Sequence, residues 1–267
     1  MRTLGVYLAE LLEAYDVDTI FGIPGVHTVE LYRGLPLTRL RHVTPRHEQG
    51  AGFMADGYSR VTGKPGVCLL ITGPGLTNAA TAMAQAYADS IPMLVITGVN
   101  AEGRMGSGRG WLHELKDQRA FAEQISARST TIHTREDLDE AIAKAFALFA
   151  TKRPRPVHIE IPTNVMRMKV DAAIKAERRA FPAKISPEND RILSAAQLLN
   201  HAQSPLILVG GGAIDAAASI ETLAERLDAP VVMTVNGRGI LSADHPLALP
   251  FNPSLPALRE VMAQADV

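Results

Sequence analysis

The sequence predicts an α/β protein: a parallel six-stranded sheet with helices on both faces, followed by an incomplete second Rossmann-like α/β domain. Continuous apolar runs such as 67–71 have the composition of strands that are buried on both faces. Patterns with helical spacing separate these runs along the chain. Strands that alternate with helices favour a parallel sheet, because each parallel connection needs a crossover that a helix can supply.

The first 165 residues carry most of these elements, and we assign them to one complete domain. Apolar residues recur with helical spacing from Leu4 to Tyr15, and Thr3 stands where a helix cap belongs. Further helices are expected at 27–34, 47–60, from Gly75 to about Asp89, and 135–150. Strands are expected at 19–21, 67–71, 93–96 and 157–161.

The chain changes character at 166–189, which is rich in Lys and Arg, contains Pro182 and Pro187 and has no strong period. This composition predicts a linker. Beyond it, helices are expected at 191–202 and 215–227, with strands at 206–209 and 231–233. Residues 190–267 are few for closing a second sheet, so we expect the N-terminal part of a domain and a fragment of a longer protein.

Composition narrows the classes of partner. Lys and Arg number 27 and Asp and Glu number 28, so the chain has no general attraction for nucleic acid or for an anionic membrane. No apolar run approaches the roughly 20 residues that span a bilayer, and the N-terminus lacks the pattern of a signal peptide. Cys68 is the only cysteine, which fits a reducing compartment. We therefore expect a cytoplasmic protein without nucleic-acid or membrane partners.

Three loops are expected at one edge of the first sheet. They are 21–25 (Phe-Gly-Ile-Pro-Gly), 46–51 (Arg-His-Glu-Gln-Gly-Ala) and 72–78 (Thr-Gly-Pro-Gly-Leu-Thr-Asn). Ligands of open α/β sheets bind at this carboxyl edge. Each motif alone has an ordinary explanation: a turn, a first-turn acid of a helix at Glu48, and a strand-to-helix turn without the lysine of a P-loop. Their order and spacing together are much more specific.

With residues 55–66 (Ala-Asp-Gly-Tyr-Ser-Arg-Val-Thr-Gly-Lys-Pro-Gly) and 89–93 (Asp-Ser-Ile-Pro-Met), these loops resemble the N-terminal half of a known enzyme family. It is the thiamine diphosphate (ThDP) dependent family of acetolactate synthases and 2-oxo-acid decarboxylases. The resemblance runs from Gly5 to His245 and is most specific over 20–100. It implies that 1–165 is a pyrimidine-binding domain and that 190–267 begins the family's central domain.

The resemblance also implies a role for Glu48. In the family, the glutamate at this place bonds to the ring nitrogen N1′ of the cofactor and thereby helps to remove the proton from its C2 atom. The protein supplies orientation and electrostatics for chemistry that belongs to the cofactor. The other cofactor-binding residues that the resemblance implies are Ile23, Pro24, Gly25, Thr72, Gly73 and Asn78.

The family holds Mg²⁺ and the diphosphate on a C-terminal domain with a Gly-Asp-Gly motif. That motif does not occur in this sequence. The resemblance therefore implies no metal ligand in this chain and places the Mg²⁺ site on a domain that the chain lacks. Because the family's site forms between two subunits, a homodimer or homotetramer is expected.

The resemblance places Val26, His27 and residues 111–118 near a small 2-oxo-acid substrate. Leu112-His113 stands where acetolactate synthases usually carry Phe-Gln, which favours decarboxylation over acetolactate synthesis. The combination looks most like the branch named for 5-guanidino-2-oxopentanoate decarboxylase. Its substrate has a cationic tail, with which Glu114 or Asp117 could pair in fork geometry.

Several alternatives stay open. Residues 114–117 could be a solvated charged face. His113 and Asp117, if they share a helix face, could form a metal site, although further ligands are missing. Gly210–Gly212 could be a structural turn or could bind a nucleotide such as FAD. The whole protein could be the large subunit of an acetolactate synthase, or a non-catalytic nucleotide- or cofactor-binding protein.

Overall fold

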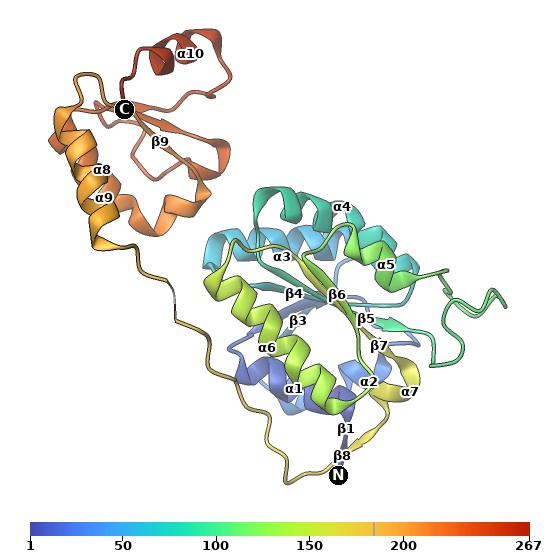
Figure 1. Cartoon of the computed structure of the whole chain (residues 1–267). Helices are drawn as coiled ribbons and strands as arrows, with labels where there is room; N and C mark the ends of the chain where they lie inside the picture. Colours follow the sequence, from blue (N-terminus) through green and yellow to red (C-terminus); the bar gives the residue numbers. More distant parts are fainter. Residues whose placement is uncertain (184) are drawn as a thin grey trace. The chain divides into compact units, whose positions relative to one another are not determined.

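The computed structural model describes residues 1–183 and 185–267. The chain divides into two compact units, Met1–Lys184 and Ile185–Val267, and each is described here by itself (Figure 1). The linker predicted at 166–189 includes Lys184, which lies outside the described residues.

A parallel six-stranded sheet forms the centre of the first unit (Figure 1). Its strand order is β3-β2-β4-β5-β7-β6. The register places Phe21 beside Cys68, Cys68 beside Val95, and Val95 beside His158. The predicted six-stranded parallel sheet is confirmed. The strands are β2 (Thr19–Gly22), β3 (Arg41–Val43), β4 (Gly66–Leu70), β5 (Met93–Val99), β6 (Arg128–Thr131) and β7 (Val157–Pro162).

Helices cover both faces of this sheet. On one face, α1 (Leu4–Ala14) and α6 (Arg135–Thr151) pack on side chains such as Leu69 and Ile96. On the other face, α3 (Glu48–Thr62), α4 (Pro74–Asp89) and α5 (Gln118–Glu123) pack on neighbours such as Cys68 and Val95. Successive strand residues point to opposite faces, so every residue of the central strands is buried. This two-sided burial is the physical reason for the continuous apolar runs.

Local signals in the sequence set the helix ends. Thr3 caps α1 by accepting a hydrogen bond from the amide of Val6 at 3.4 Å, as predicted. Gly63, with φ of 71°, ends α3 in the left-handed conformation that glycine adopts without strain. The small residues of α3 allow a close contact with α4: a Cβ atom on Gly52 would lie 2.5 Å from the Cβ atom of Ala82.

Some elements of the first unit differ from the prediction. The helix expected at 27–34 is a single turn, α2 (Val29–Tyr32), followed by the 3₁₀ turn Leu35–Leu37, where Pro36 supplies no backbone donor. The sequence pattern did not predict the positions of the two outer strands, β3 and β6. Both are short and mostly polar, as edge strands commonly are, so they carry no apolar signal.

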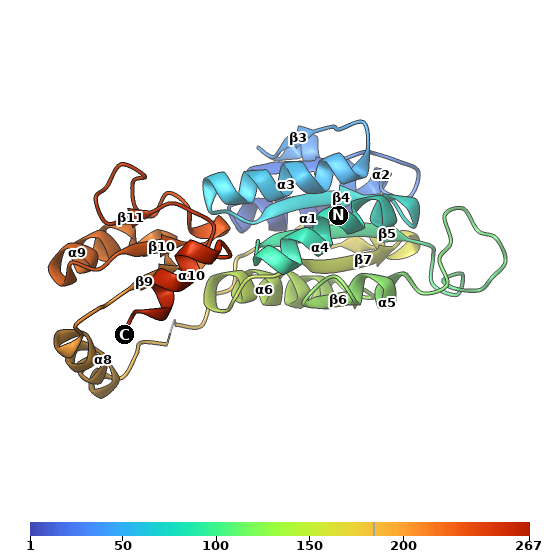
Figure 2. The same ribbon diagram turned by 90° about the horizontal axis from the view of Figure 1, so that it is seen from above.

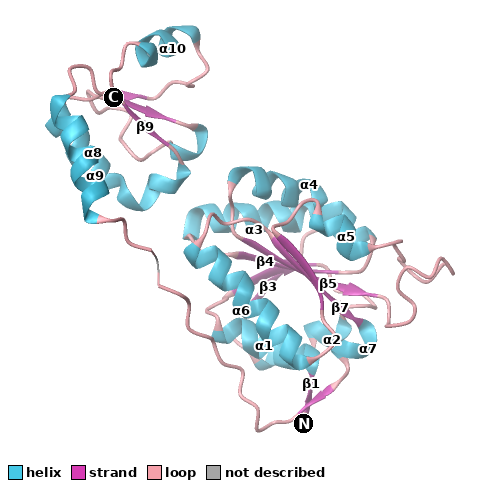
Figure 3. Ribbon diagram, in the orientation of Figure 1, coloured by secondary structure: helices cyan, strands magenta, loops and turns pink. Residues whose placement is uncertain are grey.

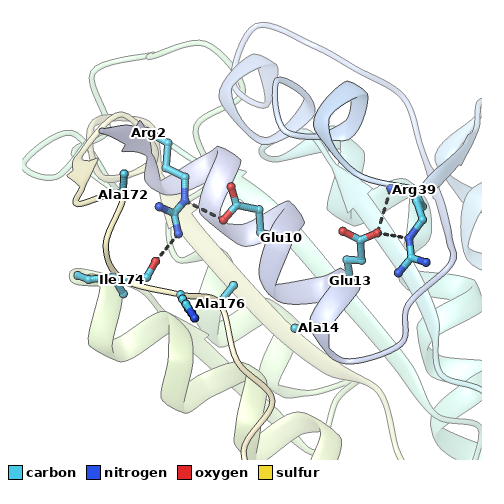
Figure 4. A pocket seen from close by; sticks show the side chains of 9 residues that line it. Arg2, Glu10, Glu13, Ala14, Arg39, Ala172, Ile174 and Ala176 are labelled. Carbon is cyan, nitrogen blue, oxygen red and sulfur yellow. Dashed lines mark hydrogen bonds and ion pairs between the residues drawn. The ribbon is translucent and has the colours of Figure 1, made fainter.

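The chain after β7 first stays close to the first unit. It forms α7 (Thr163–Met166) and then β8 (Lys169–Val170), which pairs antiparallel with β1 (Arg2–Thr3). Arg2 donates to the carbonyl oxygen of Asp171 at 3.1 Å. It also donates to the carbonyl oxygen of Ile174 at 2.6 Å and pairs with Glu10 at 2.8 Å (Figure 4). The first part of the predicted linker is therefore held against α1.

The hollow drawn in Figure 4 has a volume of about 670 Å³ and lies beside the C-terminal half of α1. Four of its charged side chains pair with one another: Arg2 with Glu10, and Arg39 with Glu13 at 2.7 Å. It contains none of the residues predicted to bind cofactor or substrate.

The second unit is a smaller α/β structure (Figure 3). Its strands are parallel, in the order β11-β10-β9. Val209, Ala224 and Val231 belong to its small core. The helix expected from 215 begins at 217, because Gly211–Ala216 forms a 3₁₀ turn. The elements are α8 (Asn189–His201), β9 (Ile207–Val209), α9 (Ala217–Leu227), β10 (Val231–Met233), β11 (Ala248–Leu249) and α10 (Pro256–Ala263).

Across the described residues, every helix is too short or too polar to span a lipid bilayer.

His158 is a fully buried titratable group on β7. Its Nε2 atom lies 2.9 Å from the hydroxyl of Thr97, and its Nδ1 atom lies 2.8 Å from the hydroxyl of Ser129. Burial lowers the pKa of His158 to about 3, because the interior disfavours the charged imidazolium. The ring is therefore neutral in the folded protein at neutral pH.

We expect His158 to make the stability of this chain fall at acid pH. The unfolded chain binds a proton at His158 below about pH 6.5 and the folded chain does not until about pH 3. Between these values, this group should lower the free energy of unfolding by about 1.4 kcal/mol per pH unit as the pH falls. Urea unfolding at several pH values measures the effect. His158→Gln, which keeps hydrogen-bonding groups but does not titrate, serves as the control. Identical pH dependence in the two proteins would contradict a neutral buried His158.

Candidate active site

The three predicted loops lie at the carboxyl ends of adjacent strands. β2 pairs with β3 on one side and with β4 on the other, so the segments that follow these strands share one edge of the sheet. Two helices begin there: α3 at Glu48 and α4 at Pro74 (Figure 1). This edge is where ligands bind in open α/β sheets.

The first loop, Gly22–Gly25, is shaped by close backbone contacts. A Cβ atom on Gly22 would lie 2.0 Å from the carbonyl oxygen of Leu69, so this position requires glycine. The amide of Gly25 donates to the buried hydroxyl of Thr28 at 3.1 Å. Pro24 limits the backbone further, while Ile23 is half-buried and Pro24 exposed. Ile23, Pro24 and Gly25 thus form a rigid turn at the edge.

Glu48 is the first residue of α3, and Asn78 lies in the beginning of α4. The side-chain amide of Asn78 donates to Oε2 of Glu48 at 2.9 Å. His47 caps α3 by accepting from the amide of Gln49 at 3.2 Å. The structure therefore brings Glu48 and Asn78 together, and the half-buried carboxylate is held in one orientation near the N-termini of two helices.

Thr72 and Gly73 link β4 to α4. Gly73 has φ of 61° and ψ of −103°, a conformation that essentially only glycine adopts. Its amide donates to the side-chain oxygen of Gln118 at 2.8 Å. A Cβ atom on Gly73 would lie 2.2 Å from the carbonyl oxygen of His113, so the loop after β4 and the loop before α5 touch at this point.

The rings of His27 and His113 face each other near the contact between Gly73 and His113. Their ring centroids are 5.9 Å apart and the ring planes meet at 81°. Burial, together with the nearby His113, lowers the pKa of His27. The side chain of Asn100 holds the neighbouring segment by donating to the carbonyl oxygen of Leu112 at 3.0 Å. Val26, by contrast, is 72% exposed and does not join this pair.

Buried polar atoms without a hydrogen-bond partner gather beside residues 72–78, the predicted cofactor loop. Among the described residues, four buried side-chain nitrogen or oxygen atoms lack such a partner, and three of them lie here: Oγ1 of Thr72 and the Nδ1 atoms of His27 and His113. A Cβ atom on Gly98 would lie 3.1 Å from Oγ1 of Thr72 and 3.2 Å from the Cβ atom of His27, which shows how close these groups are. Buried polar atoms are almost always bonded, so such a group indicates a place for a polar ligand. These residues fit the cofactor and substrate site that the resemblance implies.

The carboxylate of Glu114 accepts hydrogen bonds from residues of its own loop. Its Oε1 atom accepts from the hydroxyl of Ser107 at 2.9 Å and the amide of Gly108 at 2.8 Å, and its Oε2 atom accepts from the amides of Gly110 at 2.9 Å and Trp111 at 3.1 Å. A carboxylate offers about four acceptor positions. Pairing with a cationic substrate would therefore have to break the bonds that hold this loop.

Residues 111–117 do not form a helix. His113 has φ of 58°, and α5 begins only at Gln118, with Asp117 as its N-cap through a bond from the amide of Ala120 at 2.8 Å. The expectation that His113 and Asp117 share a helix face is wrong, since the left-handed residue interrupts any helical turn. The metal site considered for this pair loses its geometric basis.

The loop 101–117 extends away from the sheet in two perpendicular views (Figures 1 and 2). Its four glycines, at 103, 106, 108 and 110, all have positive φ. The guanidinium of Arg104 stacks over the ring of Trp111 at 4.1 Å. The loop thus combines internal bonds with wide exposure to solvent.

Several residues that shape the site were not singled out from the sequence. The hydroxyl of Tyr32 donates to the carbonyl oxygen of Leu69 at 3.0 Å, and the ring of His42 lies 3.0 Å from the carbonyl oxygen of Gly22. Gln118 and Glu160, both buried, bond to each other at 3.0 Å. Their partners are distant in the sequence, so no local pattern marks them.

In the second unit, one described group of side chains could offer three ligand atoms to a metal: Glu221, Glu225 and His245. Nδ1 of His245 accepts from the amide of Leu247 at 3.2 Å. The ring proton then belongs on Nε2, which lies 3.6 Å from Glu225 and is not free to bind a metal.

The glycine turn at 210–212 leads into a 3₁₀ turn rather than directly into an α-helix. A dinucleotide loop needs the first turn of an α-helix to bind the phosphates. The observed geometry therefore favours the structural explanation of this turn.

Comparison with known proteins agrees with this geometry. Residues 2–121 match the family described as thiamine pyrophosphate enzyme, N-terminal TPP binding domain, and residues 192–267 match the thiamine pyrophosphate enzyme, central domain. Thiamine pyrophosphate (TPP) is another name for ThDP.

Individual relatives fall into two groups. The chain is 50% identical over 265 residues to a probable 2-ketoarginine decarboxylase of Pseudomonas aeruginosa, which covers 99% of this chain and 47% of the relative. It is 37% identical over 248 residues to the acetolactate synthase isozyme 1 large subunit of Escherichia coli, covering 91% of this chain and 43% of the relative. It is 36% identical over 241 residues to the acetolactate synthase large subunit of Corynebacterium glutamicum, covering 88% of this chain and 38% of the relative.

The chain thus spans about half the length, or less, of these curated relatives. Its two matched regions account for most of its residues, and the site geometry falls within the first of them. The chain belongs to the thiamine pyrophosphate enzymes and carries their N-terminal TPP-binding domain together with residues of their central domain.

Proposed function

We propose that this protein is a ThDP-dependent 2-oxo-acid decarboxylase and that this chain supplies the pyrimidine-binding half of its active site. The observation that carries the proposal is the convergence of Glu48, held by Asn78, with the unpartnered polar atoms of Thr72, His27 and His113 at one sheet edge. A carboxylate fixed near helix N-termini, beside open hydrogen-bonding positions, suits a cofactor with a polar heterocyclic ring.

Bound ThDP supplies the C2 chemistry that makes loss of CO₂ from a 2-oxo acid possible. Glu48 would share a proton with ring nitrogen N1′, and Asn78 would keep the carboxylate oriented. Ile23, Pro24 and Gly25 would contact the pyrimidine, with Thr72 and Gly73 lining the same place. Each of these groups binds, orients or holds a proton, and none replaces the cofactor's own chemistry.

For the substrate, we propose a 2-oxo acid with a guanidino or other polar tail. The support is the 50% identity to a probable 2-ketoarginine decarboxylase, against 36–37% for the acetolactate synthases. The free Nδ1 atoms of His27 and His113 could bond to the carboxylate or the oxo group of such a substrate. We do not assign the tail to Glu114, because its four acceptor positions are occupied by the loop.

Acetolactate synthesis is the second candidate, and the synthase relatives support it. The presence of Glu48 with its partner Asn78 argues against a non-catalytic binding protein.

Mg²⁺ and the diphosphate would bind to a part of the protein beyond this chain. The 3₁₀ turn at Gly211–Ala216 gives no support for FAD at that position.

We also propose that the active protein is a homodimer or homotetramer in the cytoplasm, without nucleic-acid or membrane partners. On α3, Phe53 and Met54 are each 43% exposed, and the exposed side of the adjoining α4 is rich in small residues. Apolar side chains on a face poor in charge suit a subunit interface. The buried free thiol of Cys68 suits a reducing compartment.

The substrate proposal predicts a preference of the full-length enzyme. Its kcat/KM for decarboxylation of 5-guanidino-2-oxopentanoate should exceed that for pyruvate by roughly tenfold or more, because pockets built for polar groups discriminate strongly. A side-by-side assay of CO₂ release and acetolactate formation tests this. Acetolactate as the dominant product from pyruvate would favour the second candidate.

Glu48→Gln should lower turnover of the full-length enzyme by about 10²–10⁴, the range of general acid–base groups. Gln can still accept the bond from Asn78, so the fold should persist, but it cannot exchange a proton with N1′. The direct measurement is deuterium exchange at C2 of bound ThDP, with Glu123→Gln on the exposed side of α5 as the control. Exchange as fast as in the wild type would remove Glu48 from this role.

The assembly proposal is tested by Phe53→Asp. A charge on the exposed face of α3 should shift the full-length enzyme toward monomers at concentrations where the wild type sediments as a dimer or tetramer. Val61→Asp provides a matched control, because Val61 is 87% exposed at the other end of the same helix. If both variants assemble like the wild type, Phe53 does not lie in the interface.

A further inference from the structure

A polar row runs through the otherwise apolar face that packs against α3, α4 and α5. Thr97 on β5 lies beside Glu160 on β7, and Thr131 on β6 lies on the other side of Glu160. Ser129 lies beside His158 in the same way. Thr97, His158 and Glu160 are at most 3% exposed. Burial of polar groups is costly unless every group is bonded, so such a row calls for a specific reason.

Gln118 joins this row to the cofactor loop. Its Oε1 atom accepts from the amide of Gly73 at 2.8 Å. Its Nε2 atom lies 2.9 Å from the carbonyl oxygen of Gly98, 3.0 Å from Oε2 of Glu160 and 3.1 Å from the hydroxyl of Thr97. The reverse amide orientation would turn a donor toward the Gly73 amide and an acceptor toward the Glu160 carboxylate, so only one orientation satisfies both sides.

Glu160 is the group that holds Gln118 in this orientation. It is 3% exposed, and its second oxygen accepts from the hydroxyl of Thr131 at 2.7 Å. Burial raises the pKa of Glu160, while the bonds from Thr131 and Gln118 act in the opposite direction. The carboxyl group thus has a fixed donor on each oxygen and leaves Gln118 a single way to face Gly73.

The position held by this pair matters because Gly73 adopts an unusual backbone conformation, with φ of 61° and ψ of −103°. Glycine reaches this conformation without strain, but it also reaches many others, so the surrounding contacts decide which one Gly73 keeps. Gly73 follows Thr72, whose hydroxyl is unpartnered, and opens α4, whose Asn78 holds Glu48. A shift at Gly73 would therefore move groups on both sides of the candidate site.

We propose that Gln118 and Glu160 are positioning residues that hold the Thr72–Asn78 segment in its cofactor-binding conformation through the amide of Gly73. This inference rests on the proposed function of the same edge. Gln118 also directly follows the loop 101–117, so the pair connects that loop to the cofactor loop. Neither residue touches the cofactor or substrate in this proposal.

The first test is Gln118→Met in the full-length enzyme, which keeps length but removes both polar groups. The ThDP dissociation constant, measured calorimetrically with Mg²⁺ present, should rise about tenfold, as expected when a buried amide loses its acceptor. Turnover at saturating ThDP should change much less. In the cofactor-free protein, the Gly73 amide should exchange with deuterium faster than in the wild type.

The second test separates positioning from general damage to the fold. Gln118→Glu keeps an acceptor for Gly73 but places a carboxylate oxygen against both Glu160 and the carbonyl oxygen of Gly98, so ThDP affinity should fall. Adding Glu160→Gln removes the like-charge contact and should restore part of that affinity. Ser129→Ala is the matched control within the same polar row: it should lower stability and leave ThDP affinity and Gly73 exchange unchanged.

Each outcome decides a separate point. Wild-type ThDP affinity and Gly73 exchange in Gln118→Met would overturn the proposal. A double variant no better than Gln118→Glu would remove Glu160 from it. If the wild-type enzyme neither binds ThDP nor decarboxylates any 2-oxo acid, the proposed function fails instead, while Gly73 exchange still reports whether Gln118 holds the loop.

Discussion

Burial of the central sheet on both faces constrains almost everything else in the first unit. Every residue of β4 and β5 is buried, with one core beneath α1 and α6 and another beneath α3, α4 and α5. Polar groups can then lie only at the ends of the strands or in the interior with complete hydrogen bonding. Glu48, His27 and His113 lie beyond the strand ends. His158 and Glu160 lie in the interior and are hydrogen-bonded.

Close backbone contacts position the loops at the carboxyl edge. Gly22 approaches the carbonyl of Leu69, and Gly73 approaches the carbonyl of His113, at distances where a side chain would not fit. The first contact joins the end of β2 to β4, and the second joins the loop after β4 to the segment before α5, both without large side chains. The unpartnered polar atoms of Thr72, His27 and His113 lie beside these contacts, as expected of a preorganised binding site.

The exposed loop 101–117 follows a different principle. It has little apolar packing, and the carboxylate of Glu114 organises it from within by accepting four hydrogen bonds. Asp117 then caps α5, and Gln118 turns inward to Gly73 and Glu160. The exposed loop, the N-cap of α5 and the buried amide of Gln118 are therefore consecutive in the chain, and they link the loop to Gly73 at the carboxyl edge of the sheet.

The sequence by itself determined the α/β class, the central strands, most helices and the identity of Glu48, Gly73 and Asn78 as residues of one edge. It could do so because apolar runs, glycines and helix caps act locally and leave local patterns. The short edge strands β3 and β6 could not be located from the sequence, because neither contains an apolar run. Only the tertiary structure decided that His27 faces His113, that Glu114 serves its own loop, and that Gln118 and Glu160 hold Gly73. Those contacts join residues up to 86 positions apart in the chain, and a contact between residues so distant in the sequence leaves no periodic pattern that could predict it.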